Sequence, residues 1–125
     1  MLSQKFDHLR RLATEALKAY EFFYAESADR ADAWEFTWSR ERPGGNAYVS
    51  LAIIESGLRN YDFEVWAGAD NGLSYARQLV RSLTNIDHYD SHSEGFVPEI
   101  MSAIRSAADR ALSLSDTSLT QRYPI

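Results

Sequence analysis

Two histidines stand among acidic residues in the segment 87–94, which is the only cluster of metal-ligand residue types in the sequence. His88 and His92 are four residues apart, so on a helix both imidazole rings would lie on one side, as two zinc ligands must. Asp87, Asp90 or Glu94 could complete such a site. The segment lacks an apolar helical pattern and the glutamate that follows the first histidine in zinc-protease motifs. We therefore expect a solvated acidic loop, and a metal-dependent hydrolase using His88, His92 and Asp90 is the alternative.

Arg77 and Arg81 form a second candidate, for anion binding. Residues 72–85 repeat apolar side chains at helical spacing, so we predict a helix there with both guanidinium groups on one face. Two such groups could hold a phosphate or a carboxylate through paired hydrogen bonds. The ordinary interpretation of the same pair is a solvated helix face with salt bridges to acidic neighbours.

The sequence shows no catalytic signature. The chain has no cysteine, which excludes a thiolate nucleophile, a thiolate metal site and a disulfide. No strand–turn–helix elbow presents a serine, and His8 falls on the exposed side of a predicted helix. We therefore predict no catalytic residue and no cofactor.

The elements that must position any site begin with three runs in which apolar and polar residues alternate, between Ala33 and Gly68. Alternation with a period of two places every second side chain on the same face of a β-sheet. One face then collects the large apolar side chains of Trp34, Phe36, Trp38, Val49, Leu51, Ile53, Tyr61, Phe63 and Val65.

The turns between these runs set the expected register. Residues 42–45 are Arg-Pro-Gly-Gly, a strong turn signal, and with this loop Phe36 pairs with Leu51. At the second turn, a two-residue loop would place Leu51 opposite Asp62, whereas a three-residue loop over 56–58 places Leu51 beside Phe63. We adopt the three-residue loop, because a one-residue slip would move every side chain to the other face.

Helices are expected on both sides of the strands. Residues 3–24 repeat apolar side chains at three- and four-residue steps, and residues 98–114 begin with a proline suited to a first helical turn. Residues 26–32 are expected to form an acidic connection. The predicted order is α-β-β-β-α-α, a two-layer α+β domain over 1–114 whose three-stranded antiparallel meander is covered on one face by helices, followed by a tail over 115–125. A coiled-coil dimer through 3–24 is the alternative for the first helix.

The outer face of this sheet is the main candidate binding site. The adopted register places Glu35 near Asp62, and Tyr48 near Trp66, with Glu64 between the two groups. Stiff aromatic side chains provide contact area at little entropic cost, and the carboxylates would favour a basic partner. The alternatives are a solvated face on which the two aromatics cover each other, or a face buried by the tail or by another subunit.

Composition limits the class of protein. The net charge of −5 argues against a nucleic-acid binder, which needs a basic surface. The expected helix–three strands–helix order is similar to that of the double-stranded-RNA-binding domain, but residues 70–86 hold two arginines and no lysine where that module carries a lysine-rich helix start. No apolar run approaches the roughly 18 residues of a membrane helix, and no signal-peptide core is seen.

The sequence therefore predicts a small acidic cytosolic protein-binding module of the inhibitor, immunity or chaperone type. It would act through Tyr48, Trp66, Glu35, Asp62 and Glu64 on the outer sheet face, with a protein partner that could be basic, and it could form a homodimer. A cytoplasmic location is the expectation.

Overall fold

The computed structural model describes residues 6–29, 32–57, 60–87, 96–114 and 123–124. They form two helices and six strands, which are α2 (Asp7–Lys18), β1 (Phe23–Asp29), β2 (Ala33–Arg42), β3 (Gly45–Gly57), β4 (Asn60–Asp70), β5 (Ser74–Asp87), α3 (Val97–Ser113) and β6 (Tyr123–Pro124).

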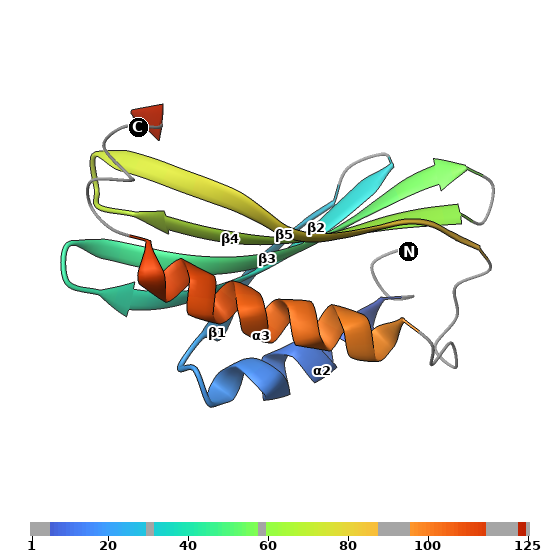
Figure 1. Ribbon diagram of the computed structural model, residues 1–125, viewed down its shortest axis with the longest axis horizontal. Coiled ribbons are helices and arrows are strands. Elements are labelled where there is room, and N and C mark those ends of the chain that lie inside the picture. Colours follow the sequence, from blue (N-terminus) through green and yellow to red (C-terminus); the bar gives the residue numbers. More distant parts are fainter. Residues whose placement is uncertain (1–5, 30–31, 58–59, 88–95, 115–122, 125) are drawn as a thin grey trace.

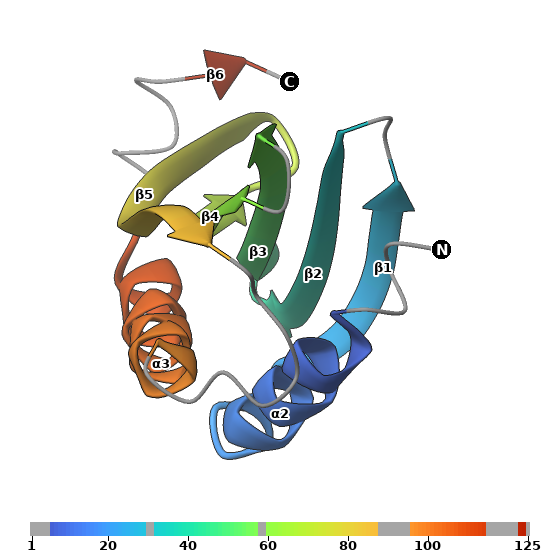
Figure 2. The ribbon, with the colours of Figure 1, turned by 90° about the vertical axis from the view of Figure 1, so that its right-hand side faces the viewer.

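The strands form one antiparallel sheet in the order β1-β2-β3-β4-β5-β6, so each strand lies beside its neighbour in the sequence (Figure 1). Both helices lie on the same side of this sheet, as Figure 2 shows in a view turned by 90°. The predicted α+β class and the helix-covered antiparallel meander are confirmed. The predicted number of three strands is wrong, because five long strands and the two-residue β6 are present.

The segment 72–85, predicted as a helix, lies almost entirely in the 14-residue strand β5. Two bulges explain the misleading spacing. Pairing shifts between Val65 and Trp66 and again between Tyr61 and Phe63, and each shift adds one residue to β5. Every added residue resets the alternation. The partly buried side chains that pack against the core are therefore three residues apart, as on a helix, at Val80, Leu83 and Ile86.

The first predicted helix, over 3–24, is also too long, because α2 ends at Lys18. The backbone N–H of Phe22 donates to the carbonyl of Leu17 at 3.2 Å, and that of Glu21 donates to Lys18 at 3.0 Å. This is a Schellman ending, in which the left-handed position is normally glycine. Here Glu21 adopts it, with φ of 61°. The chain turns and enters β1, so part of the predicted connection over 26–32 is strand.

The third predicted helix, over 98–114, is confirmed with α3 at Val97–Ser113. Pro98 lies in its first turn, where the missing N–H costs nothing, and Glu99 lies at the positive end of the helix dipole. Within the predicted tail, β6 pairs with Ser74 and Tyr75 at the start of β5.

The predicted register is confirmed for β2 and β3, where Phe36 pairs with Leu51. Between β3 and β4 the prediction is wrong by two residues, because Leu51 pairs with Val65 and not with Phe63. The strands continue to Gly57 and Asn60 through a bulge, so the connection is shorter than the predicted loop. A slip of two residues keeps each side chain on its face, and the core face is therefore as predicted.

Trp38 is the largest fully buried side chain of the core between the sheet and the helices. Its indole Nε1–H donates to the hydroxyl of Thr14 on α2 at 3.0 Å, which satisfies a polar group that cannot reach water. This bond joins the first helix to the centre of β2.

We expect Thr14→Val to destabilise the protein by about 1–3 kcal/mol, because valine keeps the shape of threonine and leaves the buried indole N–H without an acceptor. Urea denaturation measures the free energy of unfolding. The matched control is Thr84→Val at an exposed position of β5. An equal effect of the two variants would contradict the proposed role of the hydrogen bond.

Two adjacent glycines at the β2–β3 turn tolerate alanine differently. A Cβ at Gly45 would lie 1.9 Å from the backbone oxygen of Asp70, whereas Gly44 has φ of 83° and open space around it. We expect Gly44→Ala to cost about 1–2 kcal/mol for the left-handed conformation. Gly45→Ala should cost about 3 kcal/mol or more, because backbone must move. Thermal denaturation of both variants checks the order, and a larger loss for Gly44→Ala would contradict it.

Candidate functional site

The candidate site lies on the sheet face opposite the two helices. Strand pairing places Glu35 of β2 opposite Ala52 of β3, and Ala52 opposite Glu64 of β4. The two carboxylates therefore belong to one row across the sheet, with only a methyl group between them. Trp66 follows two residues after Glu64 on the same face.

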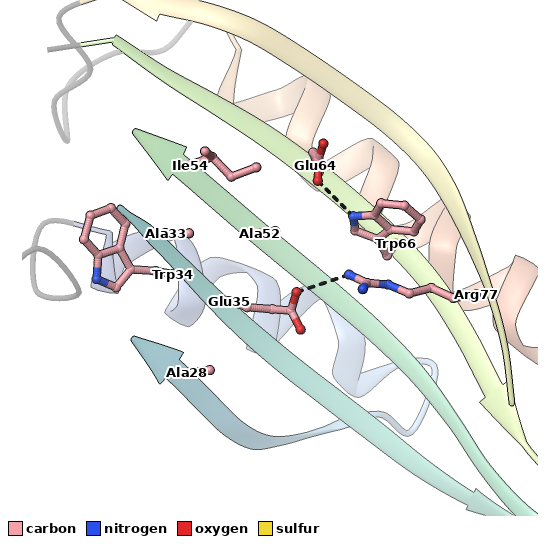
Figure 3. Close-up of a pocket in the computed structure, with 9 residues that line it drawn as sticks. All are labelled: Ala28, Ala33, Trp34, Glu35, Ala52, Ile54, Glu64, Trp66 and Arg77. Atoms are coloured by element: carbon pink, nitrogen blue, oxygen red, sulfur yellow. Dashed lines mark hydrogen bonds and ion pairs between the residues drawn. The ribbon is translucent and has the colours of Figure 1, made fainter. Parts of the chain in front are cut away.

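A hollow of about 220 Å³ opens in this face (Figure 3). Small side chains leave the space free, since Ala28, Ala33 and Ala52 contribute only methyl groups. Charged and aromatic groups border it. The full lining is Ala28, Ala33, Trp34, Glu35, Ala52, Ile54, Glu64, Trp66 and Arg77.

Arg77 extends from β5 across the face toward β2, as Figure 3 shows. Its Nη2 lies 3.1 Å from Oε2 of Glu35. Its guanidinium carbon lies 4.1 Å from the centre of the Trp66 ring, a cation–π distance. Arg77 and Glu35 belong to strands separated by β3 and β4, so this contact bridges most of the width of the sheet.

Glu64 completes the group by accepting a hydrogen bond from Trp66 Nε1 at 3.2 Å. The four side chains thus form one connected set of two carboxylates, one guanidinium and one indole. The carboxylates exceed the cation by one charge. We refer to Glu35, Glu64, Trp66 and Arg77 as the hollow cluster.

Tyr48 lies apart from the hollow cluster, because the two-residue slip places it opposite Gly68 and places Trp66 opposite Ser50. The expected neighbourhood of Tyr48 and Trp66 is therefore wrong. The Tyr48 hydroxyl donates to the carboxylate of Asp70 at the β4–β5 turn. Burial, and secondly this hydrogen bond, raises the pKa of Tyr48 to about 12.

Asp62 lies two residues before Glu64 on the same strand and pairs with Ile54, which borders the hollow. Of the residues of the predicted site, Glu35, Glu64 and Trp66 lie together around the hollow. Asp62 lies beside them, and Tyr48 lies apart from them. The structure adds Arg77. Arg77 was missed as a member of this site because β5 was expected to be a helix, and only a strand assignment would have placed it opposite Gly68.

The predicted anion site of Arg77 and Arg81 is not formed. The bulge between these residues turns them to opposite faces of β5. Arg81 points to the helix side, where its Nη2 lies 2.9 Å from Oε2 of Glu99 on α3. Each guanidinium already has a carboxylate partner, so the two do not act on one anion.

The predicted metal ligands His88, Asp90 and His92 lie outside the described residues. In the part of the chain that the structure describes, no group of three His, Cys, Asp or Glu side chains is arranged to hold a metal ion. Neither described helix is long and apolar enough to cross a membrane.

Comparison of the chain with models of protein families, with curated proteins and with solved structures finds no match. Any functional assignment therefore depends on the chemistry of the site itself.

The raised pKa of Tyr48 predicts a pH dependence of stability. In the unfolded chain tyrosine loses its proton near pH 10, whereas in the folded protein Tyr48 keeps it until about pH 12. Over this interval the folded state binds more protons, so the free energy of unfolding falls as the pH rises. We expect Tyr48→Phe to lack this part of the decline. Urea denaturation of both proteins, at about one-unit steps of pH across this interval, measures the free energy of unfolding. If it falls equally with pH in the two proteins, the prediction is contradicted.

Proposed function

We propose that this protein is a small protein-binding module of the inhibitor, immunity or chaperone type, acting in the cytoplasm, and that it binds a basic partner through the sheet face that carries the hollow cluster. The observation that carries the proposal is the excess of carboxylate over guanidinium around the half-buried Trp66, on a face over which no described helix lies.

The chemistry of the hollow cluster supports a macromolecular partner. Trp66 offers a rigid aromatic surface of the kind that dominates binding energy in protein interfaces. The carboxylates of Glu35 and Glu64 attract a basic surface and accelerate the encounter with it. Asp62 extends the negative charge beside the hollow.

Exposed apolar side chains enlarge the same face. Leu79 pairs with Trp66 across β4 and β5 and is 45% exposed. Phe23 of β1 is 61% exposed. It pairs with Ser39 of β2, which in turn pairs with Tyr48 of β3, so Phe23 lies on the same face as Tyr48. An aromatic centre surrounded by charged side chains is typical of interfaces that form and dissociate.

The proposal is tested by affinity capture from the native host with the wild-type protein and two double variants. Glu35→Gln with Glu64→Gln removes two charges from the hollow cluster. Glu15→Gln with Glu99→Gln removes two charges from the helices, and each of these glutamates also has an ion-pair partner. We expect a protein that the wild type and the helix variant recover equally, and that the hollow variant recovers about tenfold less, because a hydrogen bond to a charged group contributes roughly 1.5–3 kcal/mol.

Circular dichroism and urea denaturation of all three proteins establish that the variants fold. Recovery should also fall as salt is added, because exposed charges are screened. Equal recovery by the two double variants, or recovery of no protein above the bare matrix, would contradict the proposal. Capture of a second copy of this chain alone would identify a homodimer, and it would contradict the proposal of a basic partner, because the chain carries a net charge of −5.

A further inference from the structure

We propose that the hollow is a receptor for a single arginine side chain of the partner, and that Arg77 occupies its binding groups in the free protein. This proposal rests on the proposed function and names the chemical group that would be recognised.

The contacts of Arg77 show that the hollow cluster can hold a guanidinium group. Glu35 lies 3.1 Å from one guanidinium nitrogen, and the Trp66 ring lies 4.1 Å from the guanidinium carbon. A carboxylate beside an aromatic face is the usual protein receptor for this cation. Arg77 reaches Glu35 from β5, across the intervening strands β3 and β4.

The size of the hollow suits one side chain. At about 220 Å³ it is smaller than the roughly 300–1,000 Å³ of sites for drug-sized ligands. The methyl groups of Ala28, Ala33 and Ala52, with Ile54, provide an apolar lining for the methylene stem of a long cationic residue.

The net negative charge of the hollow cluster attracts an incoming cation. Glu35 and Glu64 carry two negative charges, and Arg77 supplies one positive charge. Arginine fits better than lysine, because a planar guanidinium can stack on Trp66 while it binds a carboxylate with two N–H groups.

Arg77 is held weakly enough to be displaced. Its side chain and that of Glu35 are 32% and 34% exposed, so water screens their attraction. An incoming arginine must compete with Arg77 for Glu35 and Trp66. Replacement of Arg77 by a neutral residue should therefore increase the affinity for arginine by about fivefold, the combined value of a half-exposed ion pair and a cation–π contact.

The test is an NMR titration of the indole N–H signals with N-acetylarginine amide. Trp66 is the only tryptophan outside the core, since Trp34 and Trp38 are 4% and 0% exposed. We expect a saturable shift that is larger for the Trp66 signal, assigned with Trp66→Phe, than for the signal of Trp34, which borders the hollow but is 4% exposed. N-acetyllysine amide, with the same charge, should bind more weakly.

Four variants make the titration decisive. Arg77→Gln should bind about fivefold more tightly, and Arg77→Lys should lie between this variant and the wild type. Glu35→Gln with Glu64→Gln should lose about tenfold or more in affinity. Arg81→Gln is the matched control, because it removes the same charge from the same strand on the opposite face.

The absence of a saturable Trp66 shift in both the wild type and Arg77→Gln would overturn the proposal. An equal gain in Arg77→Gln and Arg81→Gln would also overturn it, because net charge alone would then explain the gain. Capture of a partner that depends on Glu35 and Glu64 could still succeed in either case, so failure of the arginine receptor is distinguishable from failure of the proposed function.

Discussion

The alternation of side chains along the antiparallel strands β2, β3 and β4 is the constraint on which the rest of the structure depends. The strands β2, β3 and β4 direct most of their large apolar side chains to one face, and both helices bury their apolar surface there. Because α2 and α3 cover that face, the alternate, mostly polar side chains of these strands lie on the opposite face. The hollow cluster is therefore a direct result of strand periodicity. A slip of one residue would bring its carboxylates into the core.

Bulges in β5 determine which charges meet on this face. A regular strand would place Arg77 and Arg81 on the same side, because four residues make two full periods. The added residue between them sends Arg77 to the hollow cluster and Arg81 to Glu99 on α3. This one bulge therefore allows Arg81 to bind α3 on one face of the sheet, while Arg77 becomes the only cation among the described residues that line the hollow.

The sequence permits prediction of those parts of the fold in which a local pattern and the global structure agree. The alternation in β2, β3 and β4 and the proline at the start of α3 indicated the correct elements and faces. Prediction failed where a backbone irregularity has no marker in the sequence. Glu21 ends α2 in a conformation that glycine usually adopts, and the bulges of β5 imitate helical spacing. Three members of the hollow cluster were identified from their common face, but the contribution of Arg77 required the structure.

The arrangement of the hollow cluster is not explained by stability. A half-exposed ion pair contributes about 0–1 kcal/mol, and its long side chains lose conformational freedom to form it. The hydrogen bond between the buried Trp38 and the partly buried Thr14 matches a neutral donor to a neutral acceptor at the edge of the core. The proposed recognition of a partner therefore depends on the arrangement of two carboxylates and a guanidinium around one indole, and not on any contribution of these groups to folding.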